Sequence, residues 1–454
     1  MNPDTTFVLT PDEYRNLLQQ AQQEPDFVFL GCLSSEGSPG RYQLFSARAE
    51  ANVTIDAQSP SEVSDSRALT KRLESIMAPF RDLAGQGKPD QHPFPGGWIG
   101  YVSYEFGYAG ERRLAPLSRP LPCPLLKAGL FLWIACLDRQ SGVYTLYINH
   151  HCDPDTRTRL DRWRQQTVTP KSELSPWHME RGFEAEQSPE RFQRDVARVK
   201  AYIEAGDCYQ ANLSQAFHGP YRGDPWHAFT ELSRAHPTPF SAYLKIEDQA
   251  ILSLSPERFL SIKNGRVLTS PIKGTRPRGT TPEQDQALRD ELKSSEKDTA
   301  ENLMIVDLLR NDLSRHCLPG TVKVPALFQV ESYRNVHHLV SHVEGQLKPG
   351  VSPFQAFLDA FPGGSITGAP KIRAMEIIRE LEPHWRGPYC GSVFYWGLND
   401  TLDSNIAIRT LFCDGESTVW CWGGGGIVAD SDPQAEYEET LTKVRPLMAF
   451  LETL

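Results

Sequence analysis

The pattern of apolar positions changes near residue 167. Before it, short apolar runs rich in β-branched and aromatic residues alternate with Gly and Pro, for example at 27–30, 96–101 and 144–148. Runs of this kind predict the strands of a sheet. The longest apolar run, at 128–136, predicts one buried strand, because a membrane span needs about 20 apolar residues.

Helical periodicity is clear at two places in the second part of the chain. Ser188 is a suitable N-cap for a helix in which Phe192 begins an apolar series and which Gly206 ends. The C-terminal segment has the same signals, with Asp432 as N-cap and Pro433 in the first turn. We therefore predict a helix at each place.

Other helices and strands are mixed along this part without a regular alternation. The pattern predicts a long helical stretch at 282–312 and strands at 250–254, 266–270, near Val322 and near Thr418. Because strands and helices do not alternate as βαβ units, an α+β fold is favoured over a doubly wound sheet. A polar segment at 167–187 without periodicity predicts a linker, which divides the chain into regions 1–167 and 188–454.

Composition excludes several classes of protein. The 454 residues carry a formal net charge of −10 without a block rich in Lys and Arg, so nucleic acid is not an expected partner. Nine cysteines are scattered without a Cys-x-x-Cys spacing, and the N-terminal residues do not resemble a signal peptide. The sequence therefore predicts a reduced, cytoplasmic protein that does not enter a membrane.

Two predicted helices carry pairs of carboxylates. Glu436, Glu439 and Lys443 share one face of the C-terminal helix, and Asp298 and Glu301 are three residues apart in the other. From the sequence alone, a solvated helix face with a Glu–Lys pair is the more common explanation of the first set. If the helices meet, the carboxylates are the oxygen ligands that Mg²⁺ accepts, with positions remaining for water and substrate.

Two glycine-rich segments are candidates for binding an anion through backbone amides. Residues 361–371 lead into a helix, but Ala369 and Pro370 stand where a nucleotide-binding P-loop has Lys and Ser or Thr. Gly423 to Gly426 lie between a predicted strand and the last helix, where a tight turn is the alternative explanation. Lys273 follows a strand beside Gly274, and a desolvated lysine can act as a nucleophile, although most lysines are solvated surface residues.

Taken together, these segments resemble the chorismate-utilising enzymes, a family that includes anthranilate, aminodeoxychorismate, isochorismate and salicylate synthases. The resemblance covers the chain from Ser188 to the C-terminus closely and the N-terminal part more loosely. It rests on the motifs LSPERF, PIKGTRPRG, AENLMIVDLLRND, HHLVS, FPGGSITGAPKIRAMEII, GGGGIVADS and AEYEET, in that order. It implies two large antiparallel sheets packed as a sandwich with helices outside.

Two positions point to one branch of that family. Members similar to anthranilate synthase have Ala where this chain has Lys273, and a lysine there resembles the aminodeoxychorismate synthases. Isochorismate-forming members carry a lysine base at the position of Gln210, and glutamine cannot deprotonate water. The resemblance therefore implies amination of chorismate at C4. Glu257 would protonate the leaving hydroxyl, Lys273 would add at C2, and ammonia would then displace it.

The resemblance also assigns binding residues. Mg²⁺ would be held by Glu301 and Glu439, with Asp298 and Glu436 outside them or acting through water. His338 would lie near the C4 hydroxyl, although a structural histidine is the alternative, and Tyr395 near the enolpyruvyl group. The full set of implied substrate contacts is Gln210, Thr275, His338, Thr367, Tyr395, Arg409, Gly424, Gly425, Gly426 and Lys443.

The resemblance also implies binding partners for the chain. A separate glutamine amidotransferase subunit would supply ammonia in a heterodimer, because no segment of the chain is long enough to be that module. Some members hold tryptophan in a pocket whose matching residues here are Ser34, Arg41, Tyr42, Pro239, Phe240 and Ser241. The alternatives are an anthranilate synthase component and a non-catalytic regulatory protein that binds tryptophan.

Overall fold

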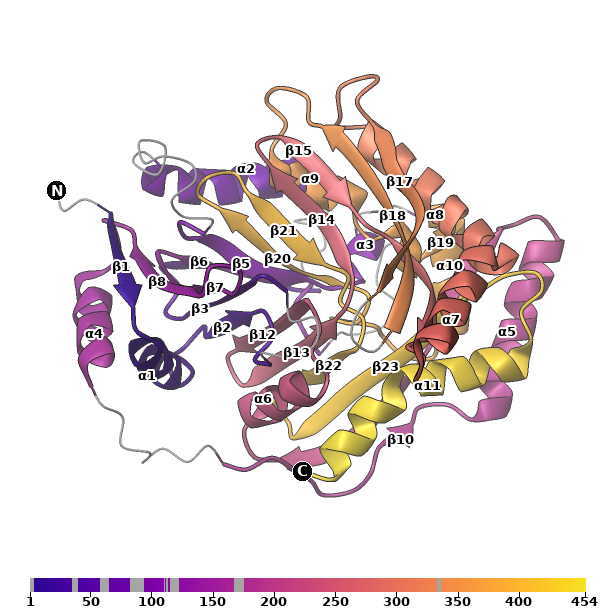
Figure 1. The fold of residues 1–454 in the computed structure, drawn as a ribbon, viewed down its shortest axis with the longest axis horizontal. Coiled ribbons are helices and arrows are strands. Elements are labelled where there is room, and N and C mark those ends of the chain that lie inside the picture. Colours follow the sequence, from indigo (N-terminus) through magenta and orange to yellow (C-terminus); the bar gives the residue numbers. More distant parts are fainter. Residues whose placement is uncertain are drawn as a thin grey trace.

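The computed structural model describes residues 4–34, 40–57, 65–81, 94–109, 111, 113–114, 122–166, 175–332 and 336–454. Two large antiparallel sheets carry the fold, and helices lie around them (Figure 1). This arrangement confirms the predicted α+β sandwich. Within the described residues, none of the helices is long and apolar enough to cross a membrane.

The first sheet contains thirteen strands. Their bounds are β1 (Thr5–Leu9), β2 (Val28–Leu30), β3 (Tyr42–Ser46), β7 (Trp133–Asp138), β8 (Val143–Ile148), β9 (His178–Met179), β10 (Glu184–Ala185), β11 (Gln210–Arg222), β12 (Phe240–Ile246), β13 (Gln249–Ser255), β19 (Gly368–Ala369), β22 (Thr410–Cys413) and β23 (Thr418–Ile427). The order across the sheet is β1-β8-β7-β3-β2-β12-β13-β22-β23-β11-β10, and β9 and β19 also pair with β11.

The second sheet contains ten strands. Their bounds are β4 (Ala51–Ile55), β5 (Gly97–Val102), β6 (Leu126–Phe131), β14 (Arg258–Lys263), β15 (Arg266–Thr269), β16 (Ile272–Pro277), β17 (Lys323–Ser332), β18 (Val336–Gln346), β20 (Ser392–Gly397) and β21 (Leu402–Asn405). The order is β16-β18-β15-β14-β21-β20-β5-β6-β4, with β17 paired to β18.

Helices lie on the outside of the sheets in Figure 1, with α1 and α4 at one end and α5, α8 and α11 at the other. The described helices are α1 (Pro11–Ala21), α2 (Ser66–Met77), α3 (Phe106–Ala109), α4 (Pro154–Gln165), α5 (Pro189–Glu204), α6 (Pro225–Ala235), α7 (Pro282–Ser294), α8 (Glu296–Ser314), α9 (Pro353–Ala360), α10 (Lys371–Leu381) and α11 (Pro433–Glu452).

Both sheets combine strands from before and after the predicted linker. Leu30 of β2 pairs with Ala242 of β12, and Trp98 of β5 pairs with Trp396 of β20. A continuous core of buried apolar residues packs between strands of both sheets. The two sequence regions are thus interleaved in each sheet. Residues 167–174 of the predicted linker lie outside the described residues, and the remainder contributes β9 and β10.

Most predicted elements are confirmed, and two are wrong in an informative way. Residues 128–136 are not one strand, because the chain leaves β6 at Leu132 and enters β7 in the other sheet. Residues 282–312 are two helices, because Ser295 is extended and its hydroxyl caps α8 by accepting from the Asp298 amide at 3.2 Å. The two predicted N-caps are present, since Ser188 caps α5 and Asp432 caps α11.

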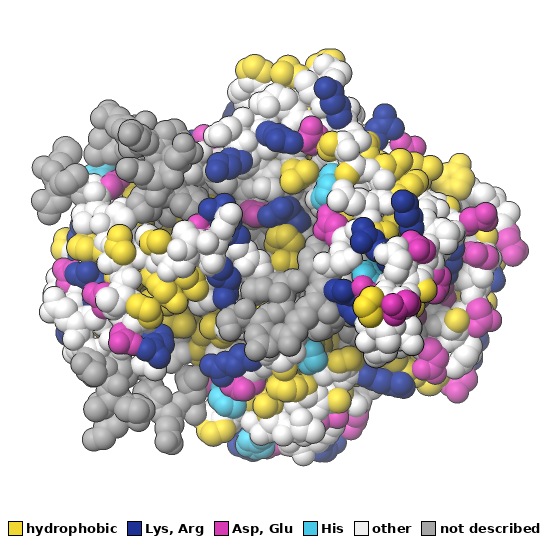
Figure 2. Space-filling model, in the orientation of Figure 1, with side chains coloured by type: hydrophobic (Ala, Val, Ile, Leu, Met, Phe, Trp, Pro, Cys, Tyr) yellow, Lys and Arg dark blue, Asp and Glu magenta, His cyan; other side chains and the backbone are white. Residues whose placement is uncertain are grey.

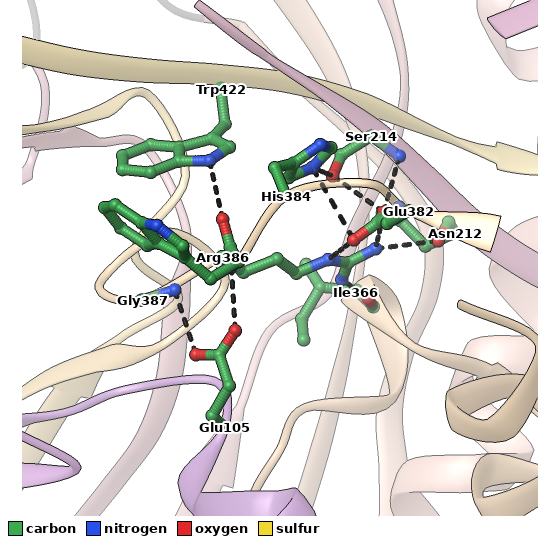
Figure 3. A network of polar contacts seen from close by, with 10 residues as sticks. Glu105, Asn212, Ser214, Ile366, Glu382, His384, Arg386, Gly387 and Trp422 are labelled. Carbon is green, nitrogen blue, oxygen red and sulfur yellow. Dashed lines mark hydrogen bonds and ion pairs between the residues drawn. The ribbon is translucent and has the colours of Figure 1, made fainter. Parts of the chain in front are cut away.

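A buried ion pair joins the sheets behind the glycine-rich turn at 361–371. The Arg386 guanidinium donates to Glu382 at 2.7 and 2.9 Å, to the Ile366 carbonyl at 3.0 Å and to the Asn212 carbonyl at 2.8 Å (Figure 3). Glu105, from the N-terminal region, accepts from the Arg386 amide at 2.7 Å. Burial raises the Glu382 pKa, but the Arg386 charge outweighs it and the pKa lies below its ordinary value.

Candidate active site

Glu257 lies between β13 and β14 in a rigid backbone setting. The Ser255 hydroxyl donates to the Ile406 carbonyl at 2.6 Å, and the Ile406 amide donates to the Glu257 carbonyl at 3.0 Å. The Glu257 side chain is only 6% exposed, and the Ser365 hydroxyl donates to its Oε1 at 3.0 Å. Ser365 belongs to the glycine-rich turn at 361–371, which therefore meets the LSPERF segment here.

Burial raises the pKa of Glu257 to about 7, against the opposing charges of Lys273 and Lys443 and the hydrogen bond from Ser365. A carboxyl with this pKa holds a proton for much of the time at neutral pH, as a general acid must. The charge effects also show that Lys273 and Lys443, from β16 and α11, both lie close to Glu257. Sequence reasoning missed Ser365, although it stands within the motif that the resemblance used.

The carboxylates of α8 and α11 lie near each other, which the sequence left open. Burial raises the pKa of Glu301, and the negative charges of Asp298 and Glu439 act in the same direction. Burial also raises the Glu436 pKa, with a hydrogen bond of 2.6 Å from the Ser431 hydroxyl opposing it. Burial acts on Glu439 too, but Lys443, whose Nζ lies 2.8 Å away, brings its pKa below the ordinary value.

These carboxylates are compatible with a bound Mg²⁺ ion. Among the residues described by the structure, no group of three or more His, Cys, Asp or Glu side chains is already arranged to hold a metal. Mg²⁺ does not require such a cage, since it commonly uses one or two carboxylates and completes its shell with water and substrate. Glu301, which is half-buried, and the more exposed Glu439 supply oxygen ligands of like charge on two helices, which is a donor set of the right chemistry.

A positively charged side chain faces the other part of the site. Arg409 is solvent-exposed, yet the surrounding protein desolvates it and lowers its pKa. Within the described residues, its guanidinium has no hydrogen bond or ion pair, so a ligand carboxylate is its natural partner. Burial, helped by the Arg409 charge, lowers the pKa of His338 to about 4. His338 is therefore neutral at pH 7, with Nδ1 2.9 Å from the Thr275 hydroxyl.

The four glycines at 423–426 are not in a turn, contrary to one explanation drawn from the sequence. They lie inside β23, where Gly424, Gly425 and Gly426 pair with β11 on one side. On the other side of β23, the pairing with β22 covers only residues 419–421 and does not reach the glycines. Their missing side chains leave room for site residues. A Cβ on Gly425 would lie 3.3 Å from Glu436 Oε2 and 3.8 Å from Lys443 Nζ, and one on Gly426 would lie 2.6 Å from Gln210 Nε2.

Gln210 lies against Gly426, and the Thr367 carbonyl accepts from the amide of Asn212, also on β11, at 2.7 Å. Gln210 is fully buried at the start of β11, and neither atom of its amide has a hydrogen bond within the described residues. Thr367 is also fully buried, and its hydroxyl donates to the Gly363 carbonyl at 3.0 Å, which closes the glycine-rich turn. Contacts of either residue with a substrate stay predictions.

The assignment of Tyr395 to the substrate is wrong. Its ring lines a separate cavity, and its hydroxyl donates to the Gly96 carbonyl at 2.9 Å. Tyr389 is the tyrosine that the fold brings to the glycine strand, because its hydroxyl lies 2.7 Å from the position of a Cβ on Gly424. Sequence reasoning missed it because β20 begins between the two tyrosines, and only the contacts of the folded chain show which one lies against β23.

The separate cavity has a volume of about 400 Å³. Five of the six residues predicted for a tryptophan pocket line it, namely Arg41, Tyr42, Pro239, Phe240 and Ser241. Ser34 is not among its described lining residues and precedes the undescribed residues 35–39. Arg258 and Asp403 form an ion pair at 2.9 Å in the cavity wall. Arg258, which lines the cavity, follows Glu257 directly at the start of β14.

The face of the molecule seen in Figure 2 shows how charge is distributed. Lys and Arg side chains gather toward its middle, whereas acidic side chains concentrate on the side where α5 lies. This separation exists although the chain has a net charge of −10. A locally positive field of this kind attracts small anions to a negatively charged protein.

Comparison with known proteins agrees with this geometry. Residues 32–449 match the family described as chorismate binding enzyme, so the chain belongs to that family. It is 38% identical to aminodeoxychorismate synthase component 1 of Klebsiella aerogenes, over 98% of this chain and 97% of the relative. Anthranilate synthase component 1 of Bacillus caldotenax is 36% identical over 82% of this chain and 77% of that protein.

A solved structure supports the same conclusion about the fold. Anthranilate synthase component I from Streptococcus pneumoniae superimposes with a TM-score of 0.73 at 27% identity. The similarity covers 92% of this chain and 94% of that one. The two-sheet architecture is therefore shared within the family.

The contact between Gly426 and Gln210 leads to a prediction about the site. Gly426→Ala will lower the stability to unfolding by about 1–3 kcal/mol, because the three atoms nearest to the new methyl group all belong to the buried Gln210. Gln210→Ala in the same chain will relieve that clash. In urea unfolding, the double variant should be more stable than the sum of the single effects predicts, by at least about 0.5 kcal/mol. Strict additivity would contradict the described contact.

Proposed function

We propose that this chain is the chorismate-aminating component of an aminodeoxychorismate synthase, which forms 4-amino-4-deoxychorismate from chorismate and ammonia. The observation that carries the proposal is the buried Glu257 carboxyl, with a pKa of about 7, beside Lys273. Relatives that bear this name are 38–43% identical over most of the chain. The alternative, an anthranilate synthase component, is less favoured because Lys273 stands where that branch carries alanine.

The reaction divides one difficult substitution into two steps. Glu257 donates a proton to the C4 hydroxyl of chorismate, the Lys273 amine forms a bond to C2, and the C4–O bond breaks to release water. Ammonia then bonds to C4, the C2–N bond to Lys273 breaks, and a proton from the incoming nitrogen returns to Glu257. Covalent catalysis of this kind replaces a high barrier with two lower ones.

Other residues would bind and orient the substrate. Arg409 would pair with one carboxylate of chorismate, and neutral His338 would lie beside the reacting ring without adding charge. Lys443 would contribute positive charge from α11, and the backbone of β23 would allow close approach of the substrate because Gly424 to Gly426 lack side chains.

We also propose that Mg²⁺ is the cofactor. Glu301 and Glu439 would hold the ion directly, and Glu436 would act through water, since its Oε1 already accepts from Ser431. When bound, the ion would neutralise the ring carboxylate of chorismate. Glu301 and Glu439 would then also fix the substrate relative to α8 and α11.

The cellular setting follows from the same proposal. Ammonia would come from a separate glutamine amidotransferase subunit, and the product would serve 4-aminobenzoate and folate synthesis. The term component 1 in the names of the relatives supports a multi-subunit enzyme. All nine cysteines are buried and free of disulfides, which is compatible with the reducing cytoplasm.

The separate cavity that Arg258 lines supports a second proposal, that it binds tryptophan. Aromatic rings of Tyr42, Phe94, Phe240 and Tyr395 line it, and its volume of about 400 Å³ suits a ligand of this size. A chain that bound tryptophan without acting on chorismate would be a regulatory protein, and the Glu257 site argues against that alternative.

The central test is identification of the product by mass spectrometry. Purified chain with chorismate, Mg²⁺ and ammonium should yield a product of aminodeoxychorismate mass, which a lyase then converts to 4-aminobenzoate. Lys273→Ala should reduce the rate by more than about 10³-fold. Lys273→Arg is the matched control, because it keeps the positive charge beside Glu257 but has no amine nucleophile, and it should be equally inactive. Full activity in either variant, or anthranilate as the product, would overturn the proposal.

The pH dependence tests Glu257 as the acid. Because the protonated form is required, the rate of Lys273 modification by chorismate, divided by the fraction of neutral Lys273, should fall as the pH rises through about 7. The Ser365 hydrogen bond favours the carboxylate, so Ser365→Ala should raise the Glu257 pKa and move this decline to higher pH. Intact-protein mass spectrometry without ammonia measures the step. A decline that stays at the same pH in Ser365→Ala would exclude Glu257 as its cause.

Tryptophan binding can be measured by equilibrium dialysis and thermal unfolding. At about 100 times its Kd, tryptophan should stabilise the folded chain by about 2.7 kcal/mol and raise Tm. Leucine is the control, since it has the same backbone groups but no ring to pack against the aromatic lining. Equal binding of both amino acids, or of neither, would reject a tryptophan site.

A further inference from the structure

Lys273 stands on an irregularity in β16. Ile272 pairs with Val340 of β18, and the next pairs are Thr275 with His338 and Arg276 with His337. Three steps along β16 therefore match two steps along β18, which is a bulge that contains Lys273 and Gly274. Gly274 has a φ of +78°, in the left-handed region. Bulges of this kind turn a side chain away from the regular sheet face.

The bulge packs against two helices. A Cβ on Gly274 would lie 2.8 Å from Asp298 Cγ on α8 and 2.8 Å from Leu292 Cδ1 on α7. Leu292 is fully buried in a small cluster with Leu339 of β18 and Val330 of β17. The Gly274 backbone thus lies directly against the Asp298 carboxyl group, with no space for a side chain between them.

Arg276 joins the same strand to both helices. Its guanidinium pairs with Asp298 Oδ2 at 3.2 Å and with Glu291 Oε1 of α7 at 2.7 Å. The Nη1 atom also donates to the Thr275 carbonyl at 3.1 Å. Arg276 and Asp298 are 25% and 18% exposed, so both groups are partly withdrawn from water and their interaction is only partly screened.

We propose that Arg276 and Asp298 form a clamp that positions the Lys273 bulge. Asp298 is then a positioning residue that acts through Arg276 and Gly274, and not a ligand of the cation held by Glu301 and Glu439. The proposal rests on the proposed function for the role of Lys273 in catalysis. It deepens that function by naming the contacts that hold the nucleophile at the geometry of attack, where an error of 1 Å costs about 10²-fold in rate.

The position of Asp298 makes this distinction necessary. It lies one turn before Glu301 on α8, where a second carboxylate is easily interpreted as part of a metal site. A ligand and a clamp respond differently to substitution. Loss of a ligand weakens the affinity for Mg²⁺, and the loss of Arg276 would not do so. Loss of the clamp slows the attack by Lys273 to the same extent whether Arg276 or Asp298 is substituted. It changes the affinity for Mg²⁺ by less than about threefold.

The experiment compares Asp298→Ala, Arg276→Gln and the double variant in the full chain. Asp307→Asn is the matched control, because Asp307 lies on the same helix and pairs with Arg310 on the exposed surface at 2.8 Å. Formation of the Lys273 adduct is followed by intact-protein mass spectrometry without ammonia. The adduct adds the mass of chorismate less one water to the chain. Each single variant should slow it by about 10–100-fold, with less than about a threefold change in half-saturation by chorismate or Mg²⁺.

Two further results are expected from the clamp. The double variant should be no slower than the slower single variant, because both substitutions remove the same interaction. Arg276→Lys, which keeps the charge, should recover part of the rate. Additive losses would show that Arg276 and Asp298 act independently, and a Mg²⁺ affinity weakened more than about threefold in Asp298→Ala alone would show that Asp298 acts as a ligand. Either result would overturn the proposal.

Hydrogen exchange separates this inference from the proposed function. Amides of residues 272–277 should exchange faster in Asp298→Ala and Arg276→Gln than in the wild type, and at the wild-type rate in Asp307→Asn. This readout does not require turnover. Absence of an adduct in the wild type would refute the proposed function. The hydrogen-exchange rates at residues 272–277 would still show whether Arg276 and Asp298 hold the bulge. Unchanged exchange in both clamp variants would overturn the clamp whatever the chemistry.

Discussion

A guanidinium buried between two sheets must be neutralised and fully hydrogen-bonded, and the rest of the site depends on how this chain meets that demand. Arg386 is paired with Glu382 and donates to the carbonyls of Asn212 and Ile366. These carbonyls belong to β11 and to the glycine-rich turn. Removing one partner of such a pair typically costs about 3–5 kcal/mol, because the other charge is left buried. The pair therefore holds the turn that presents Ser365 to Glu257.

The same burial has opposite consequences for different groups around it. Glu257 and Glu105 both have a pKa raised to about 7, because neither carboxylate has a direct ion pair. His338 stays neutral for the same reason, with its pKa lowered to about 4. Glu382 remains charged because Arg386 lies against it. One apolar environment thus yields an acid that holds a proton, a neutral imidazole and a permanent ion pair, according to the nearest charge.

Sequence reasoning succeeded where the signal is local. Ser188 and Asp432 are N-caps that satisfy amides three residues away, so their helices could be predicted from a few positions. The failures occurred where strands of different sheets meet. Leu132 divides an apolar run between the two sheets, which no periodicity reveals. Tyr389 and Tyr395 are only six residues apart, and only their contacts in the folded chain show that Tyr389 lies against Gly424 and Tyr395 lines the cavity.

The residue types at the site were legible before any fold was known, because general-acid catalysis, nucleophilic attack and cation binding each need particular side chains. Lys273 and the carboxylates of two helices were found in this way, and the family resemblance added Glu257. Folding supplied what residue type cannot encode, namely the burial that sets the Glu257 pKa and the bulge that turns Lys273. Desolvation and contact geometry arise from segments far apart in the chain. They exist only once the two sheets have packed.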